Sequence, residues 1–203
     1  MTVLTISRQF GAGGLTLGKM VSQELGFALY DNELIQLVAE KARVSTDWVR
    51  SMEKEVGKKF QKFISNLIPK SFMDRILDDQ RGYIDEAVYV DVLQKIITKI
   101  ADEGNAVIIG RGGQYILKDR PDAKRILLVS DLETRIRFVE DKYQLSHKQA
   151  AALVASDDKR RINLYKNFGR QDYDQPMLYD MVLNTGKLGF DLACRLTCQL
   201  VKG

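Results

Sequence analysis

Three glycines within four residues mark the stretch whose residue types are best suited to chemistry. Gly11, Gly13 and Gly14 separate an apolar run at residues 3–6 from apolar residues with helical spacing that begin near 13–16. Glycine allows positive φ and a close approach of the backbone to a ligand. A glycine turn from a strand into a helix directs backbone N–H groups at one point, where the helix dipole adds positive charge. The stretch predicts a phosphate-binding loop, which we favour over a tight turn without a ligand.

The loop departs from the P-loop pattern G-x-x-x-x-G-K-[ST], in which the lysine reaches the β- and γ-phosphates and the hydroxyl binds Mg²⁺. One register ends at Gly18-Lys19, but it places Met20 where the hydroxyl is required. The other register keeps the short distance from the strand and supplies Thr16 as the hydroxyl, with Gly14 at the lysine position. We prefer this second register. It assigns nucleotide phosphates to Gly11, Ala12, Gly13, Gly14, Leu15 and Thr16.

An arginine between glycines follows a fully apolar run of the chain. Residues 106–109 are Ala-Val-Ile-Ile, which is typical of a central parallel strand, and Gly110-Arg111-Gly112 comes next. Ligands of α/β proteins bind at the carboxyl edge of the sheet, where arginine suits an anion. We favour this role for Arg111 over that of a salt-bridged arginine near a turn.

Two further groups of charged residues allow two interpretations each. Asp31 follows an apolar run at 27–30 and is either the N-cap of the next helix or a carboxylate near a phosphate-transfer centre. Lys159, Arg160 and Arg161 are either a solvated face or part of a lid that lays arginines over a transferring phosphoryl group. We leave the first choice open and favour the lid in the second.

Alternating strands and helices must position these residues. We predict strands at 3–6, 27–30, 106–109, 126–129 and 179–183, a turn at 184–186, and helices from near 13–16, from Ser45, over 85–103, after Asp131, after Ser146 and over 188–201. With right-handed crossovers this order gives a three-layer α/β fold around a central parallel sheet. A chain of 203 residues is long enough for one such domain.

Composition narrows the class of protein. Hydrophobic residues make up 45% and charged residues 29%, as in soluble globular proteins, so disorder is not expected. The net charge of +4 suits an anionic substrate, but the basic residues are interleaved with acids, so nucleic acid is not expected as a partner. No leader or apolar membrane segment is apparent, which predicts a cytoplasmic protein. Cys194 and Cys198 are expected as buried, reduced thiols, and His147 as a surface residue near a helix start.

Taken together, these motifs resemble the cytidylate kinase-like family, P-loop proteins related to bacterial cytidylate kinases. The resemblance runs across the chain through Ile6-Ser7-Arg8-Gln9, Gly11-Ala12-Gly13-Gly14, Tyr30-Asp31, Ile109-Gly110-Arg111-Gly112, Asp158-Lys159 with Arg161 and Tyr165, and Tyr179-Asp180 to Asn184-Thr185. It implies one P-loop kinase domain over 1–203, with a helical acceptor-side insertion at about 43–84 that binds the monophosphate and a lid at about 143–175. It further implies transfer of the ATP γ-phosphoryl group to CMP, dCMP or a similar monophosphate, by a monomer or homodimer.

The resemblance also implies roles for single residues. Thr16 would bind Mg²⁺, and the Asn184-Thr185 pair lies where adenine would be held. The residues matched to the acceptor are Asp31, Arg111 and Asp158. The residues matched to catalysis are Arg8, Arg111, Arg160 and Arg161.

Two departures from the family pattern keep alternatives open. A cation must replace the lysine missing at Gly14, and we favour Arg8 over Lys19, which lies one turn into the helix. Gly112 stands where cytidylate kinases have an aspartate after the arginine, which leaves the acceptor base open. The alternatives to a cytidylate kinase are a nucleotide-binding sensor or scaffold without turnover, and a kinase for a different small molecule.

Overall fold

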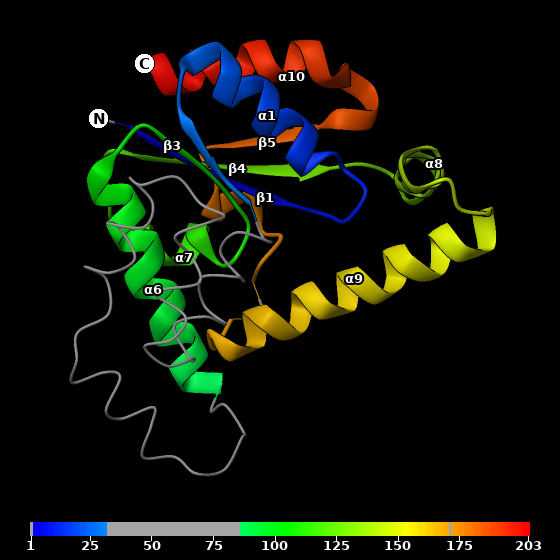
Figure 1. Cartoon of the computed structure of the whole chain (residues 1–203), viewed down its shortest axis with the longest axis horizontal. Helices are drawn as coiled ribbons and strands as arrows, with labels where there is room; N and C mark the ends of the chain where they lie inside the picture. Colours follow the sequence, from blue (N-terminus) through cyan, green and yellow to red (C-terminus); the bar gives the residue numbers. More distant parts are fainter. Residues whose placement is uncertain (1, 32–85, 171) are drawn as a thin grey trace, which may run out of the picture.

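The computed structural model describes residues 2–31, 86–170 and 172–203 of the chain (Figure 1). Its strands are β1 Val3–Arg8, β2 Ala28–Tyr30, β3 Ala106–Ile109, β4 Ala123–Val129 and β5 Met181–Asn184. Its helices are α1 Gly14–Leu25, α6 Glu86–Glu103, α7 Gly113–Ile116, α8 Leu132–Tyr143, α9 His147–Asn167 and α10 Thr185–Lys202, with a 3₁₀ turn η2 at Pro176–Leu178. The helix expected from Ser45 and the acceptor-side insertion expected at 43–84 lie outside the described residues.

The five strands form one parallel sheet in the order β2-β3-β1-β4-β5. The central strand β1 pairs with β3 on one side and β4 on the other, with Ile6 opposite both Ile109 and Ile126. Because all strands run in the same direction, their carboxyl ends meet at one edge of the sheet. The residues that follow β1, β2 and β3, including the glycine loop, Asp31 and Arg111, are therefore brought to the same edge.

Helices cover both faces of the sheet, as the three-layer prediction requires. Helices α1 and α10 pack side by side on one face, and α6 and α7 lie on the other (Figure 1). Helices α8 and α9 form a hairpin that extends away from the sheet beyond the ends of β1 and β4 (Figure 1). No helix within the described part has both the length and the apolar character needed to span a bilayer.

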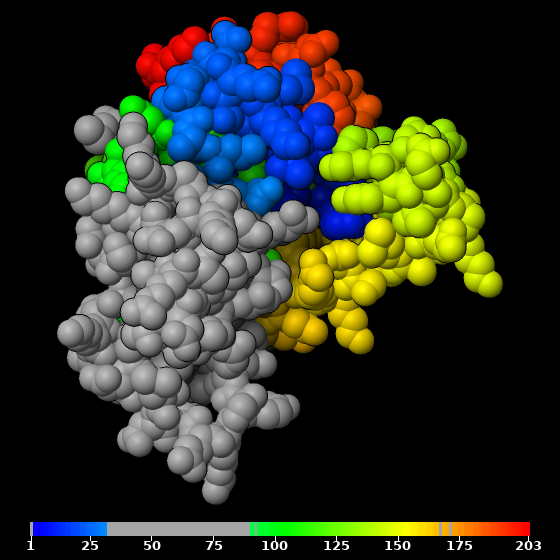
Figure 2. Space-filling view, viewed as in Figure 1, coloured from blue at the N-terminus to red at the C-terminus, as the bar shows by residue number. Residues whose placement is uncertain are grey.

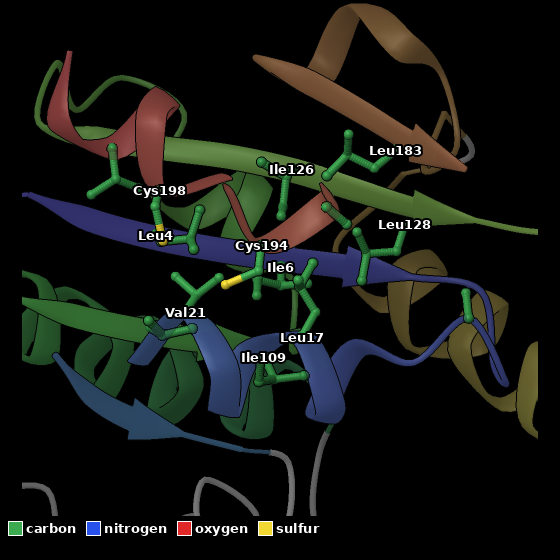
Figure 3. Close-up of a cluster of buried hydrophobic side chains, with 14 residues drawn as sticks. Leu4, Ile6, Leu17, Val21, Ile109, Ile126, Leu128, Leu183, Cys194 and Cys198 are labelled. Atoms are coloured by element: carbon green, nitrogen blue, oxygen red, sulfur yellow. The ribbon is translucent and has the colours of Figure 1, made fainter. Parts of the chain in front are cut away.

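Apolar side chains between the sheet and α1 and α10 form the main core (Figure 3). Leu4 and Ile6 of β1 meet Leu17 and Val21 of α1 there, and none of the four is exposed to solvent. Burying each such side chain stabilises the fold by about 1.5–3 kcal/mol. This packing fixes the start of α1 relative to the end of β1 and thereby fixes the loop between them.

The helix starts predicted after Asp131 and Ser146 are confirmed. Asp131 accepts a hydrogen bond from the backbone N–H of Thr134 at 2.9 Å and begins α8. Ser146 begins α9 as the first residue of a capping box with Gln149. His147 is the first residue of α9, and its side chain is exposed, as expected.

The predicted positions of the last strand and of the turn after it were wrong. The strand begins at Met181 instead of Tyr179, because the N–H of Tyr179 donates to the carbonyl of Pro176 at 3.0 Å in the 3₁₀ turn. No turn follows the strand. Asn184 ends β5 and also caps α10, accepting from the N–H of Lys187 at 3.2 Å. Strand β4 is also longer than predicted and begins at Ala123.

Cys194 and Cys198 are buried and form no disulfide, as predicted, and both face the core beneath α10 (Figure 3). Burial, reinforced by the neighbouring Cys194 thiol, raises the pKa of Cys198 to about 11. The reactive thiolate is therefore scarce at pH 8 and becomes more abundant as the pH rises towards this value. We expect the native protein to react with Ellman's reagent at pH 8 at least about 100-fold more slowly than the urea-unfolded chain. Equal rates for the native and unfolded protein would contradict the buried placement.

Candidate functional site

The loop between β1 and α1 has no space for side chains at two of its glycines. Gly11 and Gly13 have φ values of +85° and +76°. A methyl group on Gly11 would lie 2.7 Å from the carbonyl oxygen of Arg135, and one on Gly13 would lie 2.2 Å from the ring of Phe190. Gly13 is the N-cap of α1 and carries no side chain that could accept from the first N–H groups of the helix. The start of α1 is thus available to an anion.

A cleft made of two adjoining cavities opens at this edge of the sheet. Both cavities are lined by Arg8, Phe10, Arg111, Asp157 and Arg160. The larger, of about 460 Å³, is also lined by Gly11, Gly13, Gly14, Leu15, Asp31 and residues of α8. The smaller is also lined by Arg161, Leu164 and Tyr165. Figure 2 shows α8 in yellow-green and α9 in yellow projecting beside the blue residues of β1 and α1.

The cleft gathers most of the residues singled out from the sequence. The predicted site residues that line it are Arg8, Gly11, Gly13, Gly14, Leu15, Asp31, Arg111, Arg160 and Arg161. The predicted site residues that do not line these cavities are Ala12, Thr16, Asp158, Asn184 and Thr185. The predicted residues that line the cleft come from β1, the glycine loop, α1, the segments after β2 and β3, and α9, so the fold brings together residues that lie far apart in the sequence.

Three guanidinium groups converge at the end of β1. Arg8 is half-buried there, and burial lowers its pKa. Tyr165 and Asp157 act to raise this pKa, whereas the positive charges of Arg111 and Arg161 act to lower it further. Neighbouring positive charges repel one another in a partly desolvated cleft. They therefore attract an anion with several negative charges strongly.

Arg111 is held in a strained backbone conformation. It has a φ of +57° between Gly110 at +71° and Gly112 at +75°. The left-handed region costs a residue with a side chain about 1–2 kcal/mol relative to the right-handed region. Position 112 has no space for a side chain either, because a methyl group on Gly112 would lie 2.8 Å from the ring of Phe168. Strain of this kind concentrates at functional sites, and here it accompanies an arginine that lines both cavities.

The two adjacent lid arginines differ in their surroundings. Arg160 lies at the rim with 76% of its side chain exposed, and its Nη2 is 2.7 Å from Asp157 Oδ1. The side chain of Arg161 is only 12% exposed, and both terminal nitrogens contact the carboxylate of Asp174 at 2.8 and 3.0 Å. Burial acts to lower the pKa of Arg161, but the Asp174 hydrogen bonds outweigh it and raise this pKa. Arg161 is thus anchored, whereas Arg160 faces solvent.

Asp158 contacts the loop instead of the cleft. Its Oδ1 accepts from the backbone N–H of Phe10 at 3.1 Å, and its Oδ2 lies 2.7 Å from Nη1 of Arg135. The same nitrogen of Arg135 donates to the carbonyl of Phe10 at 3.0 Å, and Arg135 is only 8% exposed. We call these three residues the clasp, because they join the loop to α8 and α9. Both carboxylate oxygens of the predicted substrate-binding residue are engaged in it.

Asn184, Thr185 and Thr16 also have defined surroundings. Thr185 is buried and donates to the carbonyl of Ala12 at 3.0 Å, which supports the loop from α10. Asn184 caps α10, and Thr16 is half-buried in the first turn of α1. Of the three, Thr185 holds the loop backbone that forms one wall of the cleft.

Several residues of the cleft were missed by sequence reasoning. Asp157 precedes Arg160 by three positions, a helical spacing that could have identified the pair. Phe138 and Lys142 are four apart on α8 and line the larger cavity with Tyr143. The Lys142 ammonium is 5.6 Å from the centres of both aromatic rings. Only the hairpin arrangement of α8 and α9 reveals that this helix face borders the loop.

Comparisons with known proteins identify the family and the fold. The model of the cytidylate kinase-like family matches residues 3–187. A cytidylate kinase from Thermococcus kodakarensis is 27% identical over 192 residues, covering 93% of this chain and 82% of that protein. A crystal structure of an uncharacterized protein from Eubacterium ventriosum is similar with a TM-score of 0.70 and 21% identity, over 100% of this chain and 99% of that one. Shikimate kinase from Bacteroides thetaiotaomicron shares the fold with a TM-score of 0.52 and 12% identity, over 100% and 99% of the two chains.

The strain at Arg111 predicts an unusual order of stabilities. Arg111→Gly and Arg111→Ala remove the same contacts beyond Cβ, but only glycine adopts a φ of +57° without penalty. We expect the glycine variant to have a free energy of unfolding about 1 kcal/mol higher than the alanine variant in urea titrations. At Arg137, within α8, the order should reverse, because glycine weakens a helix. A more stable alanine variant at both positions would contradict the strain.

The clasp predicts a loss of stability when Asp158 is removed. Asp158→Ala leaves the buried Arg135 guanidinium without its carboxylate and the Phe10 N–H without its acceptor. We expect urea titration to give a loss of about 2 kcal/mol in the free energy of unfolding. Glu133→Ala is the matched control, because it breaks an ion pair with Arg137 whose side chains are 52% and 70% exposed, and it should cost less than about 1 kcal/mol. Similar losses in both variants would argue against the clasp.

Proposed function

This chain belongs to the cytidylate kinase-like family, and from that membership and the cleft we propose that it transfers the γ-phosphoryl group of ATP to a nucleoside monophosphate, with CMP or dCMP as the first acceptors to test. The observation that carries the proposal is the convergence of Arg8, Arg111 and Arg161 beside an uncapped helix start. Phosphoryl transfer needs positioning and charge neutralisation more than a covalent intermediate, and this cleft offers both.

The proposed reaction requires the γ-phosphate of ATP and the monophosphate of the acceptor to lie in line. The bond from the γ-phosphorus to the oxygen that bridges it to the β-phosphate breaks, and its electron pair stays with ADP. An oxygen of the acceptor monophosphate forms the new bond to the γ-phosphorus. The larger cavity suits this arrangement, since it runs from Gly11 and Gly13 of the loop to Asp31 and Arg111 beyond β2 and β3.

On the donor side, the loop backbone would bind the ATP phosphates. The N–H groups at the start of α1 and the positive φ values of Gly11 and Gly13 suit a phosphate chain lying across the loop. The aromatic rings of Phe138 and Tyr143 line the same cavity and provide apolar surface for the rest of the nucleotide. This assignment moves the nucleoside contact from the Asn184-Thr185 pair to α8.

Mg²⁺ is compatible with the oxygen donors present. No group of three acidic, histidine or cysteine residues that could hold a metal occurs within the described ranges. Mg²⁺ that arrives with a nucleotide keeps several waters and needs only one or two protein oxygens. The Asp157 carboxylate lines both cavities and could provide one, whereas Thr16, the ligand expected from the sequence, lines neither. When bound, the ion would neutralise charge on the β- and γ-phosphates.

On the acceptor side, Arg111 would bind the monophosphate. Its guanidinium can donate two parallel hydrogen bonds to phosphate oxygens, and it extends from a backbone turn that Gly110 and Gly112 allow. Asp31 lines the same cavity and lies where a carboxylate could accept from the nucleotide base or sugar. Arg160, exposed at the rim, is the cation with most freedom to approach the transferring group.

A second candidate function, a nucleotide-binding sensor or scaffold without turnover, is favoured by the glycine at position 14. A kinase for a different small-molecule acceptor is the other alternative, because Gly112 leaves the acceptor base open. Measurement of ADP release, and of how this release depends on the acceptor, distinguishes the two alternatives from the leading proposal.

The direct test measures ADP release from Mg-ATP with CMP, dCMP, UMP, AMP or GMP, beside a reaction without acceptor. We expect release that depends on CMP or dCMP, together with formation of the matching diphosphate. Arg111→Lys keeps the charge but loses the bidentate geometry, and we expect it to raise the KM for the acceptor at least tenfold. ATP binding without release for any acceptor would favour the sensor or a non-nucleotide acceptor.

A further inference from the structure

We propose that Arg8 and Gly14 act as a matched pair, in which Arg8 supplies the cation that a P-loop lysine would supply and Gly14 provides the space for it. The proposal rests on the proposed function and deepens it by naming the residue that contacts the β- and γ-phosphates. The cation would come from Arg8 at the end of β1, whereas the P-loop lysine would lie at the start of α1.

The geometry at Gly14 supports this exchange. A methyl group on Gly14 would lie 2.9 Å from Cγ, 3.0 Å from Cδ and 3.3 Å from Nε of Arg8. The contact involves the stem of the arginine rather than its mobile end, so a small rotation of the guanidinium does not relieve it. Arg8 therefore lies in the volume that a side chain at position 14 would enter.

The backbone gives no other reason for a glycine at this position. Gly11 and Gly13 have positive φ, but Gly14 is the first residue of α1 and lies outside the left-handed region. A helix is weakened by glycine relative to alanine, so this choice runs against local preference. The close approach of Arg8 explains it.

Lys19 does not share this placement. Its side chain is exposed on α1, and it lines neither cavity of the cleft. Arg8 lines both cavities, and its charge interacts with those of Arg111, Arg161 and Asp157. Of the two cations that the sequence offered, only Arg8 faces the space above the loop. Its planar guanidinium can also donate two parallel hydrogen bonds in a fixed geometry, whereas a lysine ammonium acts as a point charge.

The test measures binding of Mg²⁺ with a non-hydrolysable ATP analogue by calorimetry, with thermal unfolding as a check on folding. We expect Arg8→Gln to weaken binding at least tenfold and to lower kcat about 100-fold, with Arg8→Lys between it and the wild type. Gly14→Ala should weaken binding by displacing Arg8, but should have no further effect when combined with Arg8→Gln. Arg137→Gln, on α8 outside the cleft, is the matched control and should bind like the wild type.

The sharpest test moves the positive charge from position 8 to position 14. Arg8→Ala combined with Gly14→Lys should recover at least tenfold of the affinity that Arg8→Ala loses. Affinity within twofold of the wild type in both Arg8→Gln and Gly14→Ala would overturn the pair and leave the proposed kinase standing. Binding that depends on Arg8 without ADP release for any acceptor would support the pair and overturn the kinase. A wild type that does not bind the analogue would overturn both.

Discussion

The absence of space around the glycine loop is the constraint on which the site depends. Three neighbours fill the volume where side chains would lie: the α8 backbone at Arg135, the ring of Phe190 on α10 and the stem of Arg8. Each neighbour comes from a different part of the fold, and each is positioned by the packing of its own element. The loop backbone is consequently defined by tertiary contacts as much as by the conformational freedom of glycine.

Local features were predictable from the sequence because their causes are local. A strand buried on both faces is apolar throughout, as at residues 106–109, and Asp131 and Ser146 cap helices within three residues of themselves. The boundary at Asn184 was missed because two local signals overlap there: the residue ends a strand and caps a helix at once. The sequence shows a polar pair that resembles a turn, and only the hydrogen bond to Lys187 decides otherwise.

The candidate site was predictable in its composition but less so in its contacts. Position after a strand identified Arg8 and Arg111 as residues at the carboxyl edge of a sheet, and both line the cleft. The part played by Asp158 could not be read in this way, because its partners Arg135 and Phe10 lie 23 and 148 residues away along the chain. Interactions of that separation become visible only when the hairpin of α8 and α9 is folded against the loop.

Asp157 and Asp158 are adjacent on α9 but have different partners. This difference limits how a lid could move. Asp157 lines the cleft beside Arg160, whereas Asp158 belongs to the clasp with Arg135 and Phe10. A rigid swing of the whole hairpin would carry both aspartates together and would break the hydrogen bond from the Phe10 N–H. Such a swing would leave Arg135 with its carboxylate, since both lie on the hairpin, but it would also break the hydrogen bond from Arg135 to the carbonyl of Phe10. Closure over a bound phosphate would therefore have to come from residues that do not take part in the clasp, such as Arg160, whose exposed side chain lines the cleft.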